Sequence, residues 1–118
     1  MEDPLYPEAS RELHRQRQEL TPATSAAFKA FGESVFADGA LPGKIKELIA
    51  VAAAHVTQCP YCIRGHTERA LRKGATPQEV MEAIWVAAEM RAGAAYAHSN
   101  LALDAMNQFA SKHGHTVA

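Results

Sequence analysis

Residues 46–62, KELIAVAAAHVTQCPYC, decide the fold class of this chain. A Cys-x-x-Cys pair is typical of thioredoxin-like proteins such as glutaredoxins, in which a β-strand leads into the motif and a helix follows it. Here the residues before the motif include three consecutive alanines, which form helices well and strands poorly. No window of the chain alternates convincingly with the period of a strand. The stretch therefore predicts a cysteine pair between two helices of an all-α protein.

The composition supports a helical domain and argues against nucleic-acid and membrane partners. Alanine occupies 24 of the 118 positions, and 12 basic side chains balance 13 acidic ones for a net charge of -1. Without a basic surface to neutralise phosphates, we expect no nucleic-acid partner. No apolar run reaches the length of a membrane-spanning helix, and the acidic start MEDPLYPEAS lacks the pattern of a secretory signal. We therefore expect a cytoplasmic protein without a membrane partner.

Start and stop signals predict a compact single domain, residues 1–118, of about six helices. Thr76, Pro77 and Glu79 form a capping-box pattern, Gly74 is placed to end the helix before it, and we expect a break near Gly93. The expected helices are 10–20, 21–39, 43–57, one from the cysteine motif to Gly74, one from Thr76, and a last one that includes 101–109. We expect the core of the domain at about 40–100 and flexible ends at 1–9 and 111–118.

The spacing of apolar side chains predicts which residues are buried in the core and which part of the chain packs against another copy. Phe28, Phe31 and Phe36 share a helical spacing, and we expect them and Trp85 in the core. The segment LIAVAAAHV is apolar on every side, which is typical of a buried helix. The late, alanine-rich part of the chain has too little bulk to fill a core alone, so we expect a homo-oligomer.

The cysteine motif places two thiols at a predicted helix start. Pro60 favours the first helical position, which puts Cys59 at the N-cap and Cys62 in the first turn. The positive end of the helix dipole stabilises a thiolate and lowers the pKa of a cysteine. Residues three apart share a face, so the two sulfurs can form a disulfide. His66 lies one turn after Cys62 on that face and can serve as a general base.

A carboxylate is expected to complete this group. Glu47 precedes Cys59 by twelve residues, on the helix before the motif. If the chain reverses at 58–60, the two helices form an antiparallel hairpin and Glu47 lies opposite the region from His66 to Ala70. There it could orient the imidazole. We expect Tyr61 to line the wall of the site.

A metal site is the alternative for the same residues. Cys59, Cys62 and His66 could supply three zinc ligands, and His55 or His98 a fourth. A structural zinc site usually has a second tight cysteine or histidine pair, and the sequence contains none. We therefore favour a redox-active dithiol without a metal or another bound cofactor.

The spacing of these residues resembles a known family. The pattern Glu47-x11-Cys59-x2-Cys62-x3-His66 is similar to that of the alkylhydroperoxidase AhpD-like proteins of the carboxymuconolactone decarboxylase superfamily. The segment CPYCIRGHTERALRKGATPQEVMEAIWVAA resembles the family core, and the similarity covers about residues 40–100. The family's alkylhydroperoxidase has a histidine directly before its second cysteine, where this chain has Tyr61.

The resemblance implies an all-helical fold, assembled as a trimer or hexamer, that reduces hydroperoxides with electrons from an external dithiol. It implies that Cys62 is the thiol served by the proton relay and Cys59 its disulfide partner, with His66 and Glu47 as the relay. The decarboxylase branch lacks the cysteine pair. Two alternatives stay open: a non-catalytic redox-sensing or assembly module, and a decarboxylase-like lyase that uses His66 and Glu47.

Overall fold

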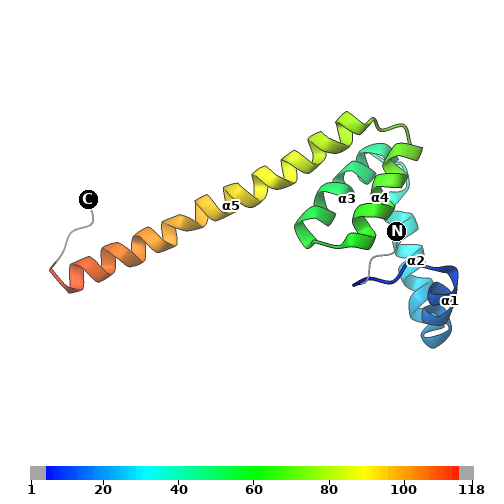
Figure 1. Ribbon diagram of the computed structural model, residues 1–118, viewed down its shortest axis with the longest axis horizontal. Helices are drawn as coiled ribbons and strands as arrows, with labels where there is room; N and C mark the ends of the chain where they lie inside the picture. Colours follow the sequence, from blue (N-terminus) through cyan, green and yellow to red (C-terminus); the bar gives the residue numbers. More distant parts are fainter. Residues whose placement is uncertain (1–4, 115–118) are drawn as a thin grey trace.

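The computed structural model describes residues 5–114, and within that range the chain consists of five α-helices joined by short loops (Figure 1). The prediction of an all-α fold is confirmed. The flexible ends expected at 1–9 and 111–118 fall partly on residues 1–4 and 115–118, which lie outside the described range. The helices are α1 (Arg11–Leu20), α2 (Pro22–Phe36), α3 (Gly43–Thr57), α4 (Pro60–Arg72) and α5 (Pro77–Lys112).

The last helix corrects the expected number of helices. We expected a break near Gly93, but α5 runs without interruption for 36 residues. A glycine inside a helix costs about 1 kcal/mol relative to alanine. The alanines around Gly93 are the best helix formers, so their preference for the helix offsets this cost. One long helix therefore replaces the two predicted ones, and it extends past residue 111.

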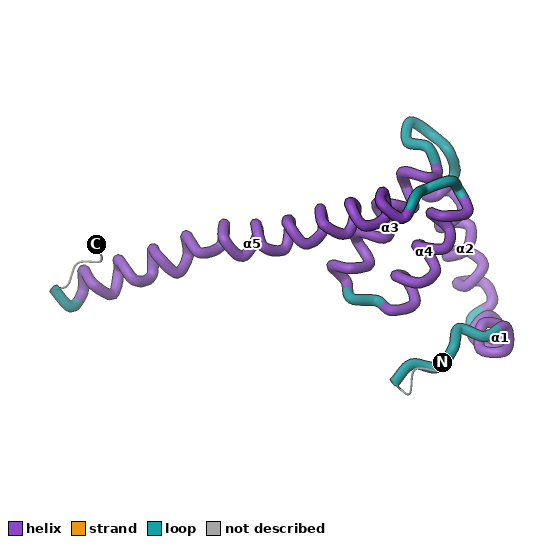
Figure 2. The backbone as a smooth tube through the Cα atoms, turned by 45° about the horizontal axis from the view of Figure 1, so that its top comes forward, coloured by secondary structure: helices purple, strands orange, loops and turns teal. Residues whose placement is uncertain are grey.

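The shape of the single chain is elongated, which corrects the expectation of a compact domain. The radius of gyration is 21.1 Å and the longest extent is 65 Å, whereas a compact domain of about 100 residues has a radius of gyration near 13 Å. Figures 1 and 2 show the cause, because α5 projects far beyond the other helices. Despite its length, neither α5 nor any other helix in the described range is apolar enough to cross a membrane.

The core is small and lies where α3 meets α4 and α5. It consists of Val51, Ala70, Ala75 and Val80, with Leu48 and Ile84 packed against it. Helix α3 buries only one face, and two of its apolar side chains, Ile49 and Val56, are about half exposed. The prediction of a helix buried on all sides is thus wrong for the single chain.

Three of the four expected core aromatic residues are exposed. Phe28, Phe31 and Trp85 retain 73%, 64% and 68% of their accessible surface. Helix α2 packs against α1 and only lightly against α3, so its middle has no neighbour to cover it. Phe36, at the end of α2, is partly buried, and its ring meets that of His66 on α4.

The start of α5 confirms the capping-box prediction. The Thr76 side chain accepts a hydrogen bond from the backbone N–H of Glu79 at 3.1 Å, and the Glu79 carboxylate accepts one from the N–H of Thr76 at 2.9 Å. Gly74 has a φ of 96°, in the left-handed region that glycine tolerates best. Together these residues turn the chain from α4 into α5.

Candidate dithiol site

The turn between α3 and α4 places the cysteines. Gln58 ends α3 in the left-handed conformation, with a φ of 60°. The chain then enters α4 with Cys59 as its N-cap and Pro60 at the first position, as predicted. The Cys59 sulfur acts as the capping group, because it accepts a hydrogen bond from the backbone N–H of Cys62 at 3.3 Å. Both cysteines are free thiols and partly exposed.

The two thiols are electrostatically unequal. The pKa of Cys59 is lowered, chiefly by a hydrogen bond from the Cys62 side chain and then by the Cys62 backbone N–H. The pKa of Cys62 is raised, chiefly because its thiol donates to Cys59, and further by partial burial. The first proton to leave the pair therefore comes from Cys59. Cys62 needs a base to become a nucleophile at the same pH.

Glu47 and His66 meet across the hairpin, as the sequence predicted. The Oε2 atom of Glu47 lies 2.7 Å from Nδ1 of His66. The Glu47 residue is 1% exposed and the His66 side chain is 17% exposed. Because the carboxylate can only accept, Nδ1 of His66 must donate, and the neutral ring then presents Nε2 as a proton acceptor. A buried carboxylate that holds one tautomer is the arrangement expected of a general base and its orienting partner.

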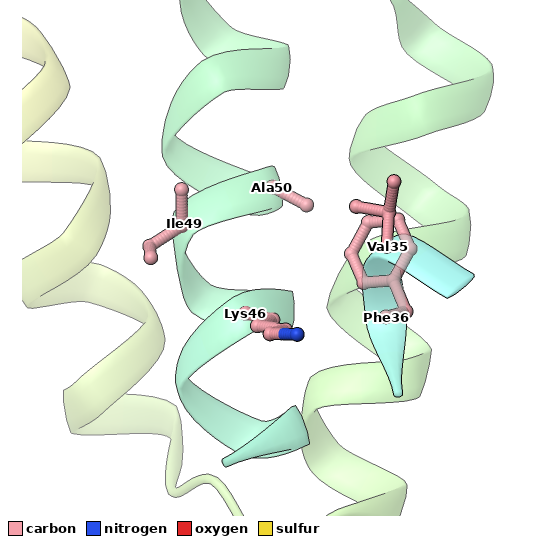
Figure 3. Close-up of a pocket in the computed structure, with 5 residues that line it drawn as sticks. All are labelled: Val35, Phe36, Lys46, Ile49 and Ala50. Carbon is pink, nitrogen blue, oxygen red and sulfur yellow. The ribbon is translucent and has the colours of Figure 1, made fainter. Parts of the chain in front are cut away.

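Phe36 supports the imidazole from α2. Its ring stacks on the His66 ring with a centroid separation of 5.1 Å and an angle of 25° between the planes. The same ring forms a wall of an open apolar groove of about 200 Å³ between α2 and α3 (Figure 3). The other groove residues are Val35, Lys46, Ile49 and Ala50. Sequence reasoning assigned Phe36 to the core, and no periodic pattern indicated its place beside the histidine.

Arg69 is a further residue of the site whose role the sequence did not indicate. By helical spacing it shares a face of α4 with Cys62 and His66, and its Nη1 lies 3.5 Å from Nδ1 of His66. Because the Nδ1 hydrogen points to Glu47, this contact is an approach of two donors and not a hydrogen bond. The guanidinium charge also acts on Cys62, where it opposes the rise in pKa.

Tyr61, expected as a site wall, contacts the N-terminal segment. Its hydroxyl donates a hydrogen bond to the carbonyl of Pro7 at 2.6 Å. Its ring meets that of Tyr6 edge to face, with centroids 5.9 Å apart. The residue between the two cysteines thus ties residues 5–9 to the start of α4.

The other histidines do not join the cysteines. His55 donates from Nδ1 to the carbonyl of Val51 at 2.7 Å, within α3, and His98 is exposed on α5. Across residues 5–114, no three His, Cys, Asp or Glu side chains are placed to hold a metal ion. In the same range, no hydrogen bond joins His66 to either sulfur.

Comparisons with known proteins agree with this fold. Residues 22–105 match the sequence pattern described as the carboxymuconolactone decarboxylase family. An uncharacterized protein of the cox locus of Paracoccus denitrificans is 65% identical over 82 residues, which cover 70% of this chain and 74% of that protein.

Two solved structures share the fold. One is a carboxymuconolactone decarboxylase family protein from Legionella pneumophila in its apo form, 35% identical, with a TM-score of 0.63 over 83% of this chain and 87% of that one. The other is a family protein from Thermotoga maritima, for which involvement in the antioxidative response is suggested. It is 26% identical, with a TM-score of 0.56 over 78% of this chain and 95% of that one.

Proposed function

The chain belongs to the carboxymuconolactone decarboxylase family, and on that premise we propose that it is a thiol-dependent peroxidase that reduces hydroperoxides through Cys59 and Cys62. The observation that carries this proposal is the buried Glu47–His66 pair, with its 2.7 Å hydrogen bond, one helical turn from a dithiol at a helix N-terminus. The antioxidative role suggested for the Thermotoga maritima relative supports it.

The first chemical step depends on the difference in pKa between the two thiols. Nε2 of His66 accepts the proton of Cys62, whose raised pKa makes a base necessary. The Cys62 sulfur attacks the terminal oxygen of the hydroperoxide, and the O–O bond breaks. The alkoxide leaves and takes the proton from His66 to become an alcohol. Cys62 is now a sulfenic acid.

The second step closes the disulfide. The Cys59 thiolate, favoured by its lowered pKa, attacks the Cys62 sulfur. Hydroxide leaves and is released as water with the proton that Cys59 gave up. One hydroperoxide and two thiols thus yield one alcohol, one water and one disulfide. An external dithiol then reduces the disulfide, and the chemistry requires no metal or other cofactor.

The test is steady-state reduction of cumene hydroperoxide with dithiothreitol as the electron donor. We expect turnover in the native chain and none above background in Cys62→Ser. The turnover of His66→Ala should be about 10²- to 10⁴-fold lower than that of the native chain, the usual contribution of a general base. His55→Gln is the matched control, because the His55 ring hydrogen-bonds within its own helix, to the carbonyl of Val51. Native turnover in Cys62→Ser would overturn the assignment.

A redox-sensing module is the second candidate, and the Tyr61–Pro7 hydrogen bond favours it. Tyr61 lies between the two cysteines, so closure of the disulfide changes the first turn of α4 at the point where residues 5–9 are attached. Limited proteolysis of residues 5–9 would then be faster in the oxidised than in the reduced protein, with peroxide turnover at background. Equal cleavage rates would count against sensing.

We also propose that the protein is a homo-oligomer, a trimer or a hexamer. Large apolar side chains are exposed along α5, and surfaces of this kind mark protein interfaces in soluble proteins. Burial of this surface against other copies would also give the middle of α2 and the outer face of α3 a neighbour. The exposed apolar residues of α5 include Trp85, Met90, Tyr96, Leu101 and Phe109.

A further inference from the structure

Arg69 carries a positive charge at the dithiol site that no carboxylate neutralises within the described range. Among residues 5–114, the ion pairs of α4 are Glu68 with Arg72 at 3.6 Å and His66 with Glu47. Arg69 joins neither pair and lies on the exposed surface. Its guanidinium instead stands 3.5 Å from the His66 ring, on the face of α4 that also carries Cys62.

The surroundings make this cation available to a ligand. Glu47, the carboxylate of the site, is 1% exposed and already accepts the hydrogen bond of His66. The guanidinium keeps its N–H donors for solvent or for a bound anion, because Nδ1 of His66 cannot accept from it. Guanidinium groups bind carboxylates through two parallel hydrogen bonds, with geometric specificity that a lysine lacks.

From this arrangement we propose that Arg69 is a specificity-determining residue, which binds a carboxylate on the substrate and so selects hydroperoxides that carry a carboxylate. The inference rests on the proposed peroxidase function. The Phe36 ring, which covers His66 and walls the apolar groove, offers a surface for the hydrocarbon part of such a molecule. The carboxylate takes no part in the bond changes, which remain those of the reduction described above.

The first experiment measures charge selection without turnover. The reduced protein is alkylated in parallel with iodoacetamide and with iodoacetate, which has a similar size but carries a charged carboxylate in place of the neutral amide. Modification of Cys59 and Cys62 is followed by peptide mass spectrometry. We expect the iodoacetate-to-iodoacetamide rate ratio to be about fivefold higher in the native chain than in Arg69→Gln, in line with an exposed charge pair. A change in thiol pKa affects both reagents alike and cancels in the ratio.

The controls isolate the position of the charge. Arg72→Gln removes an arginine one turn further along α4 that pairs with Glu68, and it should keep the native ratio. Added salt should lower the ratio in the native chain and leave that of Arg69→Gln nearly unchanged. Arg69→Lys keeps the charge and should retain part of the preference, and it serves as the test variant if Arg69→Gln does not fold.

The second experiment compares cumene hydroperoxide with its para-carboxylated analogue. We expect kcat/KM to favour the carboxylated substrate in the native chain and in Arg72→Gln. In Arg69→Gln the ratio of the two kcat/KM values should fall to about one, whatever the effect of the substitution on Cys62 itself, because a change at the thiol affects both substrates alike. Equal alkylation ratios in the native chain and Arg69→Gln, or turnover without preference for the carboxylate, would overturn the inference. Charge-selective alkylation without any turnover would refute the peroxidase proposal and support anion binding by Arg69.

Discussion

Glu47→Gln is the substitution that separates a catalytic role from a structural one. The change keeps the shape of a side chain that is 2% exposed and removes its charge. The glutamine oxygen can still accept from Nδ1 of His66, but its amide nitrogen can also donate to that atom and favour the other tautomer. The imidazole then no longer presents a fixed acceptor at Nε2.

The expected effects on stability and rate differ greatly. A hydrogen bond to a charged group contributes about 1.5–3 kcal/mol, but full burial of a carboxylate costs several kcal/mol of hydration. Since these terms oppose each other, Glu47→Gln should change the free energy of unfolding by about 1 kcal/mol or less. The rate of disulfide formation should fall about 100-fold, the lower end of what a general base contributes.

Two measurements on the same samples give this comparison. Urea unfolding of the reduced protein reports the free energy, at one protein concentration because assembly would shift it. Stopped-flow oxidation by one equivalent of cumene hydroperoxide reports the rate. Glu47→Ala is the structural reference. It leaves the His66 ring without its hydrogen-bond partner, which should lower the free energy of unfolding by about 1–3 kcal/mol. A Glu47→Gln protein that oxidises at the native rate would refute the relay.

Three further predictions concern the thiols, the fold and the assembly. Cys59 should be alkylated by iodoacetamide at lower pH than Cys62, because the pKa of Cys59 is lowered and that of Cys62 is raised. Cys59→Ala should move the pH dependence of Cys62 alkylation to lower pH, because Cys59 is the main cause of the raised pKa. Identical pH dependences for the two cysteines would contradict this. Thr76→Ala should reduce the free energy of unfolding by about 1 kcal/mol through loss of the cap, with an unchanged oxidation rate. Sedimentation should give the mass of three or six 12.8 kDa chains, and the mass of one chain would contradict the proposed assembly.

The sequence predicted the parts of the site that helix geometry alone determines. Cys59, Cys62 and His66 lie within two turns of one helix, so their common face follows from the helical period. The contact of Glu47 with His66 followed from one additional assumption, a tight reversal at 58–60, and the left-handed Gln58 supplies that reversal.

The remaining features depend on contacts between segments that no local pattern encodes. Phe36 reaches His66 because the loop after α2 sets the direction of that helix, and helical spacing says only which residues share a face with Phe36. Helical spacing gives Arg69 the face of Cys62 and His66, but no local pattern predicts its contact with His66, since that contact depends on a long side chain. At Gly93 a local signal was misleading, because alanine-rich neighbours outweigh one glycine.

The stoichiometry of peroxide-driven oxidation tests the central claim most directly. The reduced protein is treated with one equivalent of cumene hydroperoxide, then free thiols are counted and the cysteine peptides are mapped by mass spectrometry. We predict that two thiols disappear per hydroperoxide, that one alcohol is formed, and that Cys59 and Cys62 are joined within one chain. Two thiols that stay titratable, or a Cys62 oxidised to sulfinic acid with Cys59 still free, would contradict the proposed dithiol peroxidase.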